Sequence, residues 1–594
     1  MQLINRRNFL SKLYRLSGSL TALSLPLRNG SLQPGWPSTS SSCWLSVCIP
    51  FVIEDPASNL HTDIILTSAS FQGIDGHSDG AHSTDYEIYL YDCAGNPQPI
   101  DGSKRVKQLN IPAMHTTLIK CSDLIGRQGS FWGGMRIRMW ARGKEPTHVS
   151  DLFSAAFVRW NFTDSFDTLH AHPDPLQLQS PDKFFSSTPF PNLEEYSCAL
   201  CLFNPYNVPS IGKIFVYAGD GQRQIEQPYK LAPYGSTIFN LNTGALSTDH
   251  RDLFNRAVSL RKEIRRGGSI TIENDESTAK NFAYMMIKGK ANNAFSAEHT
   301  IHQGDYPIKR GSSPFGSGQS FKARGWVYSA LIFNDKTLGG LNLSSRVYVS
   351  SGRPLEDEMW LLAYVSDSEG DFHWTTMKDD RLPIWLPAGF LSQGAIRLSP
   401  FQSCELDFEK LSLTSGFAGG IGVATSPQTS HVLMKVEVRA RNWGTSAFSH
   451  FRPGSRSARA LQDIKGRGGV VSDYIISGAR LNRTGSLVEA DCLIGIFNME
   501  EDKLGEPVIE AFNSNGFIMR KNLGKVPGLA CRHFLLSDVF SEPSFKDVGP
   551  LTLRLIDSNA ALIMSALHID YKRRDIAIDH GSDRFSTYID YGCI

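Results

Sequence analysis

The chain has 594 residues, of which 41% are hydrophobic and 20% are charged, so it is long enough for several packed cores and too apolar for a largely disordered protein. Sixty basic residues against 59 acidic ones give a net charge of +1, which removes a broad electrostatic attraction to nucleic acid or to an anionic membrane. We therefore expect no nucleic-acid partner. The 51 Gly, 30 Pro, 34 Phe and 18 Tyr residues favour turns and strands over long helices.

The first part of the chain has the composition of a targeting segment. No Asp or Glu precedes Glu54, and the run Asn5-Arg-Arg-Asn-Phe-Leu-Ser-Lys12 resembles the twin-arginine export motif, although Asn5 stands where Ser or Thr is common and Lys12 lies one place late. This resemblance implies export to the periplasm or the cell exterior. The alternative is an organellar transit peptide, because such peptides are also rich in Arg and Ser and lack acidic residues. Both interpretations assign residues 1–40 to targeting.

The apolar content of the chain is too broken for a transmembrane helix. Residues 16–27 are interrupted by Ser, Gly, Thr and Pro, and no run of about 18 apolar residues occurs elsewhere. We expect a soluble mature chain without a transmembrane helix.

The ten cysteines are too sparse for a disulfide scaffold. The one Cys-x-x-Cys, Cys198-Ala-Leu-Cys201, lies in a run that predicts a strand. Residues three apart on a strand point to opposite faces, so these two thiols are poorly placed to bind one metal. We interpret them as ordinary strand cysteines.

Two landmarks recur in the same order along the chain. The first is a proline at a strand entry, at Pro112, Pro233, Pro387 and Pro527. The second is a short segment that ends in histidine, at His170, His299, His450 and His580. Each landmark returns at intervals of roughly 120–150 residues, which indicates an internal repeat.

Units of this length with many short strands and Gly/Pro turns are typical of antiparallel β-sandwiches. The sequence therefore predicts an all-β protein with four tandem antiparallel β-sandwich modules after the targeting segment. Polar joins place the modules at residues 41–175, 186–308, 322–454 and 468–594.

Alternating apolar and charged residues predict half-buried strands in equivalent places of the repeats, at residues 135–140, 434–439 and 551–555. Residues 249–266 carry apolar residues among basic ones, and are the best candidate for a short amphipathic helix.

The recurring histidine has two interpretations. In the first module it lies in His170-Ala-His172, so His170 and His172 are candidate metal ligands. A metal site needs three or four converging ligands, and only a contact between repeats could bring enough of these histidines together. We favour a structural role, in which an imidazole at a strand exit bonds loop backbone, because a fold constraint repeats with the fold whereas an active site usually occurs once.

A second candidate metal site lies in one loop of the first module. Its possible ligands are Asp75, His77, Asp79, His82 and Asp85, with glycines that let the loop curl around a cation. The loop lacks EF-hand spacing, and a polar hairpin loop is the simpler interpretation. It also contains Gly-x-Ser-x-Gly around Ser78, but a strand-like run follows where a nucleophile elbow needs a helix.

The sequence contains no Walker loop, dinucleotide fingerprint or His-Glu-x-x-His motif, and we assign no catalytic residue. We expect a binding or scaffolding protein of the cell envelope, with an envelope protein, a glycan or a second copy as partner. The alternative is a metal-dependent envelope enzyme that uses the loop at 75–85 or the His170 and His172 pair. No cofactor is expected, and a divalent metal is the one candidate.

Overall fold

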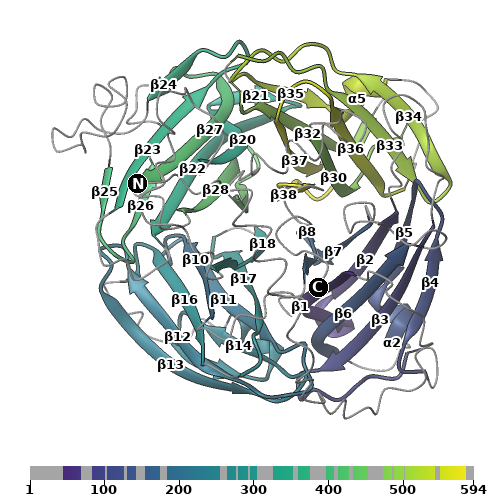
Figure 1. The fold of residues 1–594 in the computed structure, drawn as a ribbon, viewed down its shortest axis with the longest axis vertical. Coiled ribbons are helices and arrows are strands. Elements are labelled where there is room, and N and C mark those ends of the chain that lie inside the picture. The colour runs from purple at the N-terminus through teal and green to yellow at the C-terminus, as the bar shows by residue number, and fades with distance from the viewer. Residues whose placement is uncertain are drawn as a thin grey trace, which may run out of the picture. The chain divides into compact units, whose positions relative to one another are not determined.

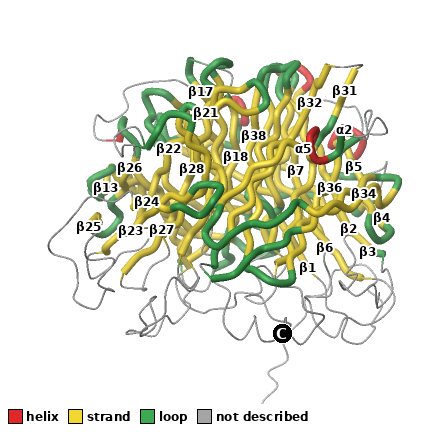
Figure 2. The backbone as a smooth tube through the Cα atoms, turned by 90° about the horizontal axis from the view of Figure 1, so that it is seen from above, coloured by secondary structure: helices red, strands yellow, loops and turns green. Residues whose placement is uncertain are grey.

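The computed structural model is nearly all β, and its described residues form seven separate antiparallel sheets (Figure 1). Figure 2 shows the same chain coloured by secondary structure, with few helices among the described residues. The structure describes residues 45–68, 83–100, 104–125, 130–141, 154–173, 184–254, 264–275, 278–291, 294–303, 326–351, 359–374, 396–406, 408, 413–426, 432–451, 472–484, 487–500, 502–541 and 549–583. The all-β, multi-sandwich prediction is confirmed.

The sheets fall into four consecutive stretches of chain, which we call groups 1 to 4. Group 1 is a nine-stranded sheet, and each later group has two five-stranded sheets. In groups 2 to 4, buried apolar side chains from both sheets share one core, so the two sheets pack face to face. Residues 43–594 form one compact unit, and the division into four separately folding modules stays a prediction.

Group 1 runs in the order β4-β3-β6-β1-β2-β7-β8, with β5 on β2 and β9 on β1. A 3-10 helix, Pro56–Ser58, and a short helix, α2 (Cys121–Ile125), interrupt it. Its strands are β1 (Leu45–Asp55), β2 (Leu60–Ser68), β3 (Thr84–Asp92), β4 (Lys107–Ile111), β5 (His115–Lys120), β6 (Phe131–Ala141), β7 (Ser154–Asn161), β8 (Phe166–His170) and β9 (His172–Pro173).

Group 2 has the sheets β13-β12-β16-β10-β19 and β15-β14-β11-β17-β18. Its strands are β10 (Phe184–Phe190), β11 (Tyr196–Phe203), β12 (Ser210–Ala218), β13 (Arg223–Leu231), β14 (Ser236–Asn240), β15 (Ala245–Ser247), β16 (Gly268–Asn274), β17 (Phe282–Gly289), β18 (Phe295–His299) and β19 (Ile301–Gln303).

Two expectations fall in group 2. The cysteine pair lies on β11 as predicted, and Cys198 faces the core of group 2 whereas Cys201 packs into the core that continues into group 1. The helix expected over 249–266 is described only at its ends, where a 3-10 helix, His250–Phe254, replaces the α-helix. Residues 255–263 lie outside the described residues.

Group 3 has the sheets β20-β27-β23-β24, with β25 on β23, and β21-β22-β28-β29, with β26 on β22. Its strands are β20 (Trp326–Asn334), β21 (Lys336–Leu338), β22 (Leu341–Ser351), β23 (Met359–Ser366), β24 (Phe372–Trp374), β25 (Ile396–Leu398), β26 (Ser403–Leu406), β27 (Phe417–Ser426), β28 (Val432–Ala440) and β29 (Thr445–Phe451).

Group 4 has the sheets β34-β33-β36-β30-β39 and β31-β32-β37-β38, with β35 on β32. A short helix, α5 (Leu536–Val539), follows β35. Its strands are β30 (Ser472–Ala479), β31 (Asn482–Thr484), β32 (Leu487–Asn498), β33 (Val508–Asn513), β34 (Gly516–Asn522), β35 (Cys531–Leu535), β36 (Leu551–Asp557), β37 (Leu562–Asp570), β38 (Asp575–Asp579) and β39 (Ser582–Asp583). Among the described residues, no helix has both the length and the apolar character needed to cross a membrane.

The alternating segments were predicted to take equivalent places, and this is wrong for one of them. Residues 135–140 and 551–555 lie in β6 and β36, which occupy matching positions in their sheets, but residues 434–439 lie in β28, next to the last strand of group 3. Their charged faces are also largely buried rather than solvated, with Arg138 and Arg439 half-buried. Arg554, for example, pairs with Asp473 through two bonds of 2.8 Å.

The proline landmark marks a bend in the backbone. Shortly after Pro112, Pro233 and Pro527, one residue has a positive φ and a strand begins: Met114 before β5, Tyr234 before β14 and Leu529 before β35. In group 3 the matching left-handed residue is Phe401, which follows Pro400 and precedes β26. The described proline landmark of group 3 is therefore Pro400. The predicted one, Pro387, lies outside the described residues.

These bends connect neighbouring groups through a repeated contact. The residue two places after each bend donates its N–H to a carbonyl just beyond a strand of the preceding group: Ser236 to Cys93 at 3.0 Å, Ser403 to Gly219 at 3.1 Å and Cys531 to Asp367 at 2.8 Å. Aromatic stacking supports two of the junctions, Tyr91 on Tyr234 and Tyr217 on Phe401. We call these contacts the outer junctions.

Groups 4 and 1 meet at the equivalent place. The hydroxyl of Thr116, two residues after the bend at Met114, bonds the hydroxyl of Thr552 at 2.6 Å. His115 lies against Gly516, the first residue of β34. Each group thus contacts the next, and group 4 contacts group 1.

Candidate metal centre

The strands that carry the recurring histidines also meet one another. Strands β8, β18, β29 and β38 each form a hairpin with the preceding strand of their sheet. They contact each other in the cyclic order β8, β18, β29, β38 and back to β8. Figure 1 labels β8, β18 and β38 near the middle of the view.

Side chains on these strands tie the groups together by hydrogen bonds that we call the inner junctions. Asp167 on β8 accepts the Ala297 N–H of β18 at 2.6 Å, and Ser296 on β18 accepts the Phe448 N–H of β29 at 2.9 Å. In both cases the acceptor lies three residues before the landmark histidine of one group and the donor two before that of the next. The same contact thus occurs twice.

Asp575, at the start of β38, bridges the remaining neighbours. Its carboxylate accepts the Phe166 N–H of β8 at 2.9 Å and the Thr445 hydroxyl of β29 at 2.6 Å. Burial raises the pKa of Asp575 from 3.8 to about 7, against the lowering effect of the bond from Thr445. Every neighbouring pair of these strands is therefore hydrogen-bonded through a side chain.

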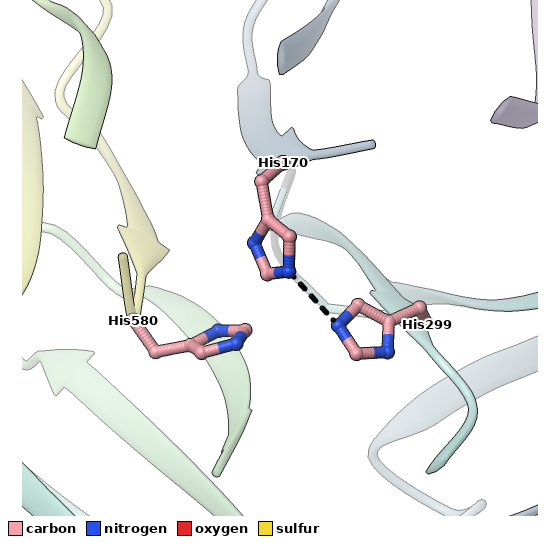
Figure 3. Close-up of side chains that lie close together, drawn as sticks. All are labelled: His170, His299 and His580. Carbon is pink, nitrogen blue, oxygen red and sulfur yellow. Dashed lines mark hydrogen bonds between the residues drawn. The ribbon is translucent and has the colours of Figure 1, made fainter. Parts of the chain in front are cut away.

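Three of the landmark histidines converge where these strands end. One ring nitrogen each of His170, His299 and His580 lies within 4.8 Å of the other two. The Nε2 atoms of His170 and His299 are 3.2 Å apart. Figure 3 shows the three rings pointing toward one another from separate parts of the chain. His170 and His299 are buried and His580 is half-buried.

The second nitrogen of each ring faces a polar group. His299 Nδ1 donates to the Thr300 carbonyl at 3.2 Å, and His580 Nδ1 lies 3.3 Å from the Ser449 hydroxyl. His170 Nδ1 lies 3.7 Å from Asp579 Oδ1. Ring contacts of this kind orient the imidazoles of metal sites.

Acidic side chains surround the histidines on the same strands. Asp167, Glu298 and Asp579 are buried beside the cluster positions in the sequence. Burial raises the pKa of Asp167 well above its ordinary value, and the nearby charge of Glu298 acts in the same direction. Lys435 on β28 is a buried cation close enough to Glu298 for the two charges to interact. Of these carboxyl groups, Asp579 lies next to a cluster ring, with its Oδ1 3.7 Å from His170 Nδ1.

Among the other predicted site residues, Asp85 is the one whose side chain is described, and it does not belong to this cluster. Asp75, His77, Asp79 and His82 lie outside the described residues. Asp85 is on β3, where it accepts a bond of 2.7 Å from Asn110 on the paired strand β4. Two further histidines, His172 and His450, are described only by their backbones, paired with Cys48 and Lys435 respectively.

Sequence reasoning chose His170 as a metal ligand but paired it with His172, its neighbour in the chain. It gave His299 and His580 as repeat landmarks, which only a contact between repeats could make ligands of one ion. The sequence did contain a signal for the cluster, since a histidine recurs near the end of an equivalent strand in each repeat. When such strands contact one another, the residues at equivalent positions come together.

No protein-family model matches this chain, and no curated protein matches it in sequence. A function must therefore be argued from the chain's own residues.

Proposed function

We propose that the protein is a binding or scaffolding protein exported to the cell envelope. The observation that carries this proposal is the repeated junction, inner and outer, between consecutive groups. Rigid sheets locked to their neighbours hold connecting loops in fixed relative positions, which is what a binding platform requires. The twin-arginine resemblance of residues 5–12 supports export.

The partner is an envelope protein, an envelope glycan or a second copy of the chain. Pairing of copies through an edge strand is disfavoured at β13, which contains Pro228 and three exposed or partly exposed charged residues, Arg223, Glu226 and Lys230. Proline and charge both discourage strand addition at a sheet edge. Association of copies through β13 is therefore disfavoured, and a glycan or another envelope protein is the partner to test first.

Binding of the processed, full-length protein to fractions of the source cell tests this proposal. We expect saturable co-sedimentation with either purified envelope glycan or an envelope protein extract, and weaker binding by a variant that opens an outer junction, Gly95→Val. The Cβ of that side chain would lie 2.1 Å from the Pro233 carbonyl oxygen. No binding to either fraction, together with no self-association by sedimentation velocity, would overturn the proposal.

A second candidate function is metal-dependent catalysis, which the convergence of His170, His299 and His580 favours over the loop at 75–85. Three imidazoles with an open fourth position are the ligand set of several catalytic zinc sites. The burial of His170 and His299 favours a structural ion instead. Hydrolysis of an activated ester by the metal-loaded protein, absent in His299→Gln, would establish the catalytic alternative.

A further inference from the structure

We propose that His170, His299 and His580 bind one divalent transition-metal ion, with zinc as the expected ion. Because the three ligands come from groups 1, 2 and 4, the ion cross-links these groups. This inference goes beyond the scaffold function, which does not depend on it.

The first argument is the spacing of the ring nitrogens. Two imidazole nitrogens on a tetrahedral zinc ion, each about 2.0–2.1 Å from it, lie about 3.3 Å apart. The His170 and His299 Nε2 atoms are 3.2 Å apart. The third nitrogen, within 4.8 Å of both, reaches the same distance after a movement of at most about 1.5 Å, which a rotation of the half-buried His580 ring can supply.

The second argument is the placement of protons in the absence of a metal. His299 Nδ1 faces a carbonyl and must carry a hydrogen, so in the neutral ring Nε2 is an acceptor. The bond between the two Nε2 atoms then requires the hydrogen of His170 to be on Nε2. In a neutral ring, that tautomer leaves His170 Nδ1 as a bare acceptor facing the carboxylate of Asp579. Added positive charge relieves this conflict, as a second proton on His170 or as a metal ion at the Nε2 atoms.

A metal ion removes this conflict. With the ion between the Nε2 atoms, the hydrogen of His170 moves to Nδ1 and can be donated to Asp579. Neither His170 Nδ1 nor Asp579 Oδ2 has a hydrogen-bond partner among the described residues, and both are buried. A carboxylate that accepts from the far nitrogen of a ligating histidine is a common second layer of zinc sites. Asp579 is therefore a positioning residue.

The ligand chemistry selects the class of ion. Neutral imidazoles suit Zn²⁺, Cu²⁺, Ni²⁺ and Fe²⁺, whereas Ca²⁺ and Mg²⁺ require oxygen ligands. The partial exposure of His580 leaves one side of the cluster on which water can complete a tetrahedron. Three imidazoles and one water form the tetrahedral arrangement that is common for zinc.

Metal content and rebinding by the full-length protein test the proposal. We expect about one equivalent of zinc to remain after gel filtration, or to rebind after chelator treatment, and Co²⁺ to give the intense visible bands of tetrahedral coordination. His299→Gln should abolish stoichiometric binding. Asp579→Asn, which keeps an acceptor for the Gly581 N–H, should weaken the affinity by about 10–100-fold.

A matched control separates loss of binding from loss of fold. His533 is a half-buried imidazole at a contact between groups, where its Nε2 lies 2.7 Å from the Ala330 carbonyl oxygen. His533→Gln should keep the full metal content, and the metal should raise the melting temperature of wild type and His533→Gln but not of His299→Gln. A wild-type protein that neither retains nor rebinds zinc, cobalt or copper would overturn the proposal and leave a shared proton between the two Nε2 atoms. Unchanged metal content in a folded His299→Gln protein would also overturn it.

Discussion

Lys435 and Asp575 are two ionisable side chains whose charged forms are disfavoured by burial. Lys435 lies on β28 at the contact with group 2, and its Nζ has no hydrogen-bond partner among the described residues. Asp575 joins three of the histidine-bearing strands. Both are fully enclosed by neighbouring groups, so each makes the stability of the protein depend on pH in a definite direction.

The first prediction concerns Lys435→Met. Burial lowers the pKa of Lys435 from 10.5 to about 8, with Glu298 acting in the opposite direction. Below pH 8 the folded protein holds a charged, buried ammonium, and stability rises as pH increases from 8 to 10.5, where the unfolded chain binds more protons. The substitution should raise the free energy of unfolding at pH 7 by up to about 3 kcal/mol, and the gain should disappear by pH 11. Urea denaturation across this pH range measures the difference in the free energy of unfolding. A variant less stable than wild type at pH 7 would contradict the prediction, and would show that the Lys435 ammonium stabilises the buried Glu298.

The second prediction concerns Asp575→Asn. With a folded pKa of about 7, Asp575 holds a proton between pH 3.8 and 7 that the unfolded chain releases, so wild-type stability falls as pH rises through this window. An asparagine keeps an acceptor for the Phe166 N–H and can donate to the Thr445 hydroxyl. The variant should match wild type near pH 4 and exceed it by up to about 4 kcal/mol at pH 8. Parallel melting curves at the two values test this, and an equal loss of stability at both would contradict it.

The outer junctions show which features of single elements can be predicted. A proline before each bend was visible in the sequence because the backbone there needs a fixed φ and a strand start, both local requirements. In group 3 the predicted landmark was Pro387, whereas the described bend follows Pro400. Two prolines in one stretch of sequence satisfy the same pattern. The alternation in 434–439 predicted a strand correctly but a solvated face wrongly, because Glu437 accepts a bond from Tyr196 of group 2. No pattern within one strand reveals such a neighbour.

The third prediction uses two glycines of group 3 with the same backbone. Gly370 and Gly416 have φ values of 92° and 89°, but a Cβ at Gly370 would lie 2.4 Å from the Gly528 carbonyl oxygen, whereas no atom of the described residues lies within 4 Å of a Cβ at Gly416. Both alanine variants carry the cost of a left-handed side chain, about 1–3 kcal/mol. Gly370→Ala should lose about 1–3 kcal/mol more, because it also strains the junction with group 4.

Guanidinium denaturation of the two variants measures the difference, with the Gly416→Ala protein as the control for the backbone term. Equal denaturation midpoints for the two variants would mean that the junction accommodates the added methyl group without loss of stability. The outer junctions would then not contribute to the stability of the protein.

At the scale of the whole molecule, the histidine cluster could be predicted only in part. The repeat showed that His170, His299 and His580 occupy equivalent positions, and that only a contact between repeats could make them ligands of one ion. Their convergence depends on β8, β18 and β38 meeting, and this contact is fixed by side chains such as Asp575 and Asp167 from distant segments. One sequence without a structure contains no measure of those distances. The recurrence of the histidine was therefore compatible with two roles, a structural residue at a strand exit and a metal ligand.

The last prediction follows from the junctions between every consecutive pair of groups, including groups 4 and 1. Apolar cores continue across them, since Leu567 and Ile576 of group 4 pack in the core of group 3. Groups coupled in this way should unfold together, so calorimetry of the full chain should give one transition with a calorimetric enthalpy near the van't Hoff value. Gly370→Ala weakens one junction and should broaden or split this transition, whereas Gly416→Ala should shift it without splitting. Separate transitions already present in the wild-type protein would mean that the groups are independent modules in loose contact, and that the junctions do not make the chain a rigid platform.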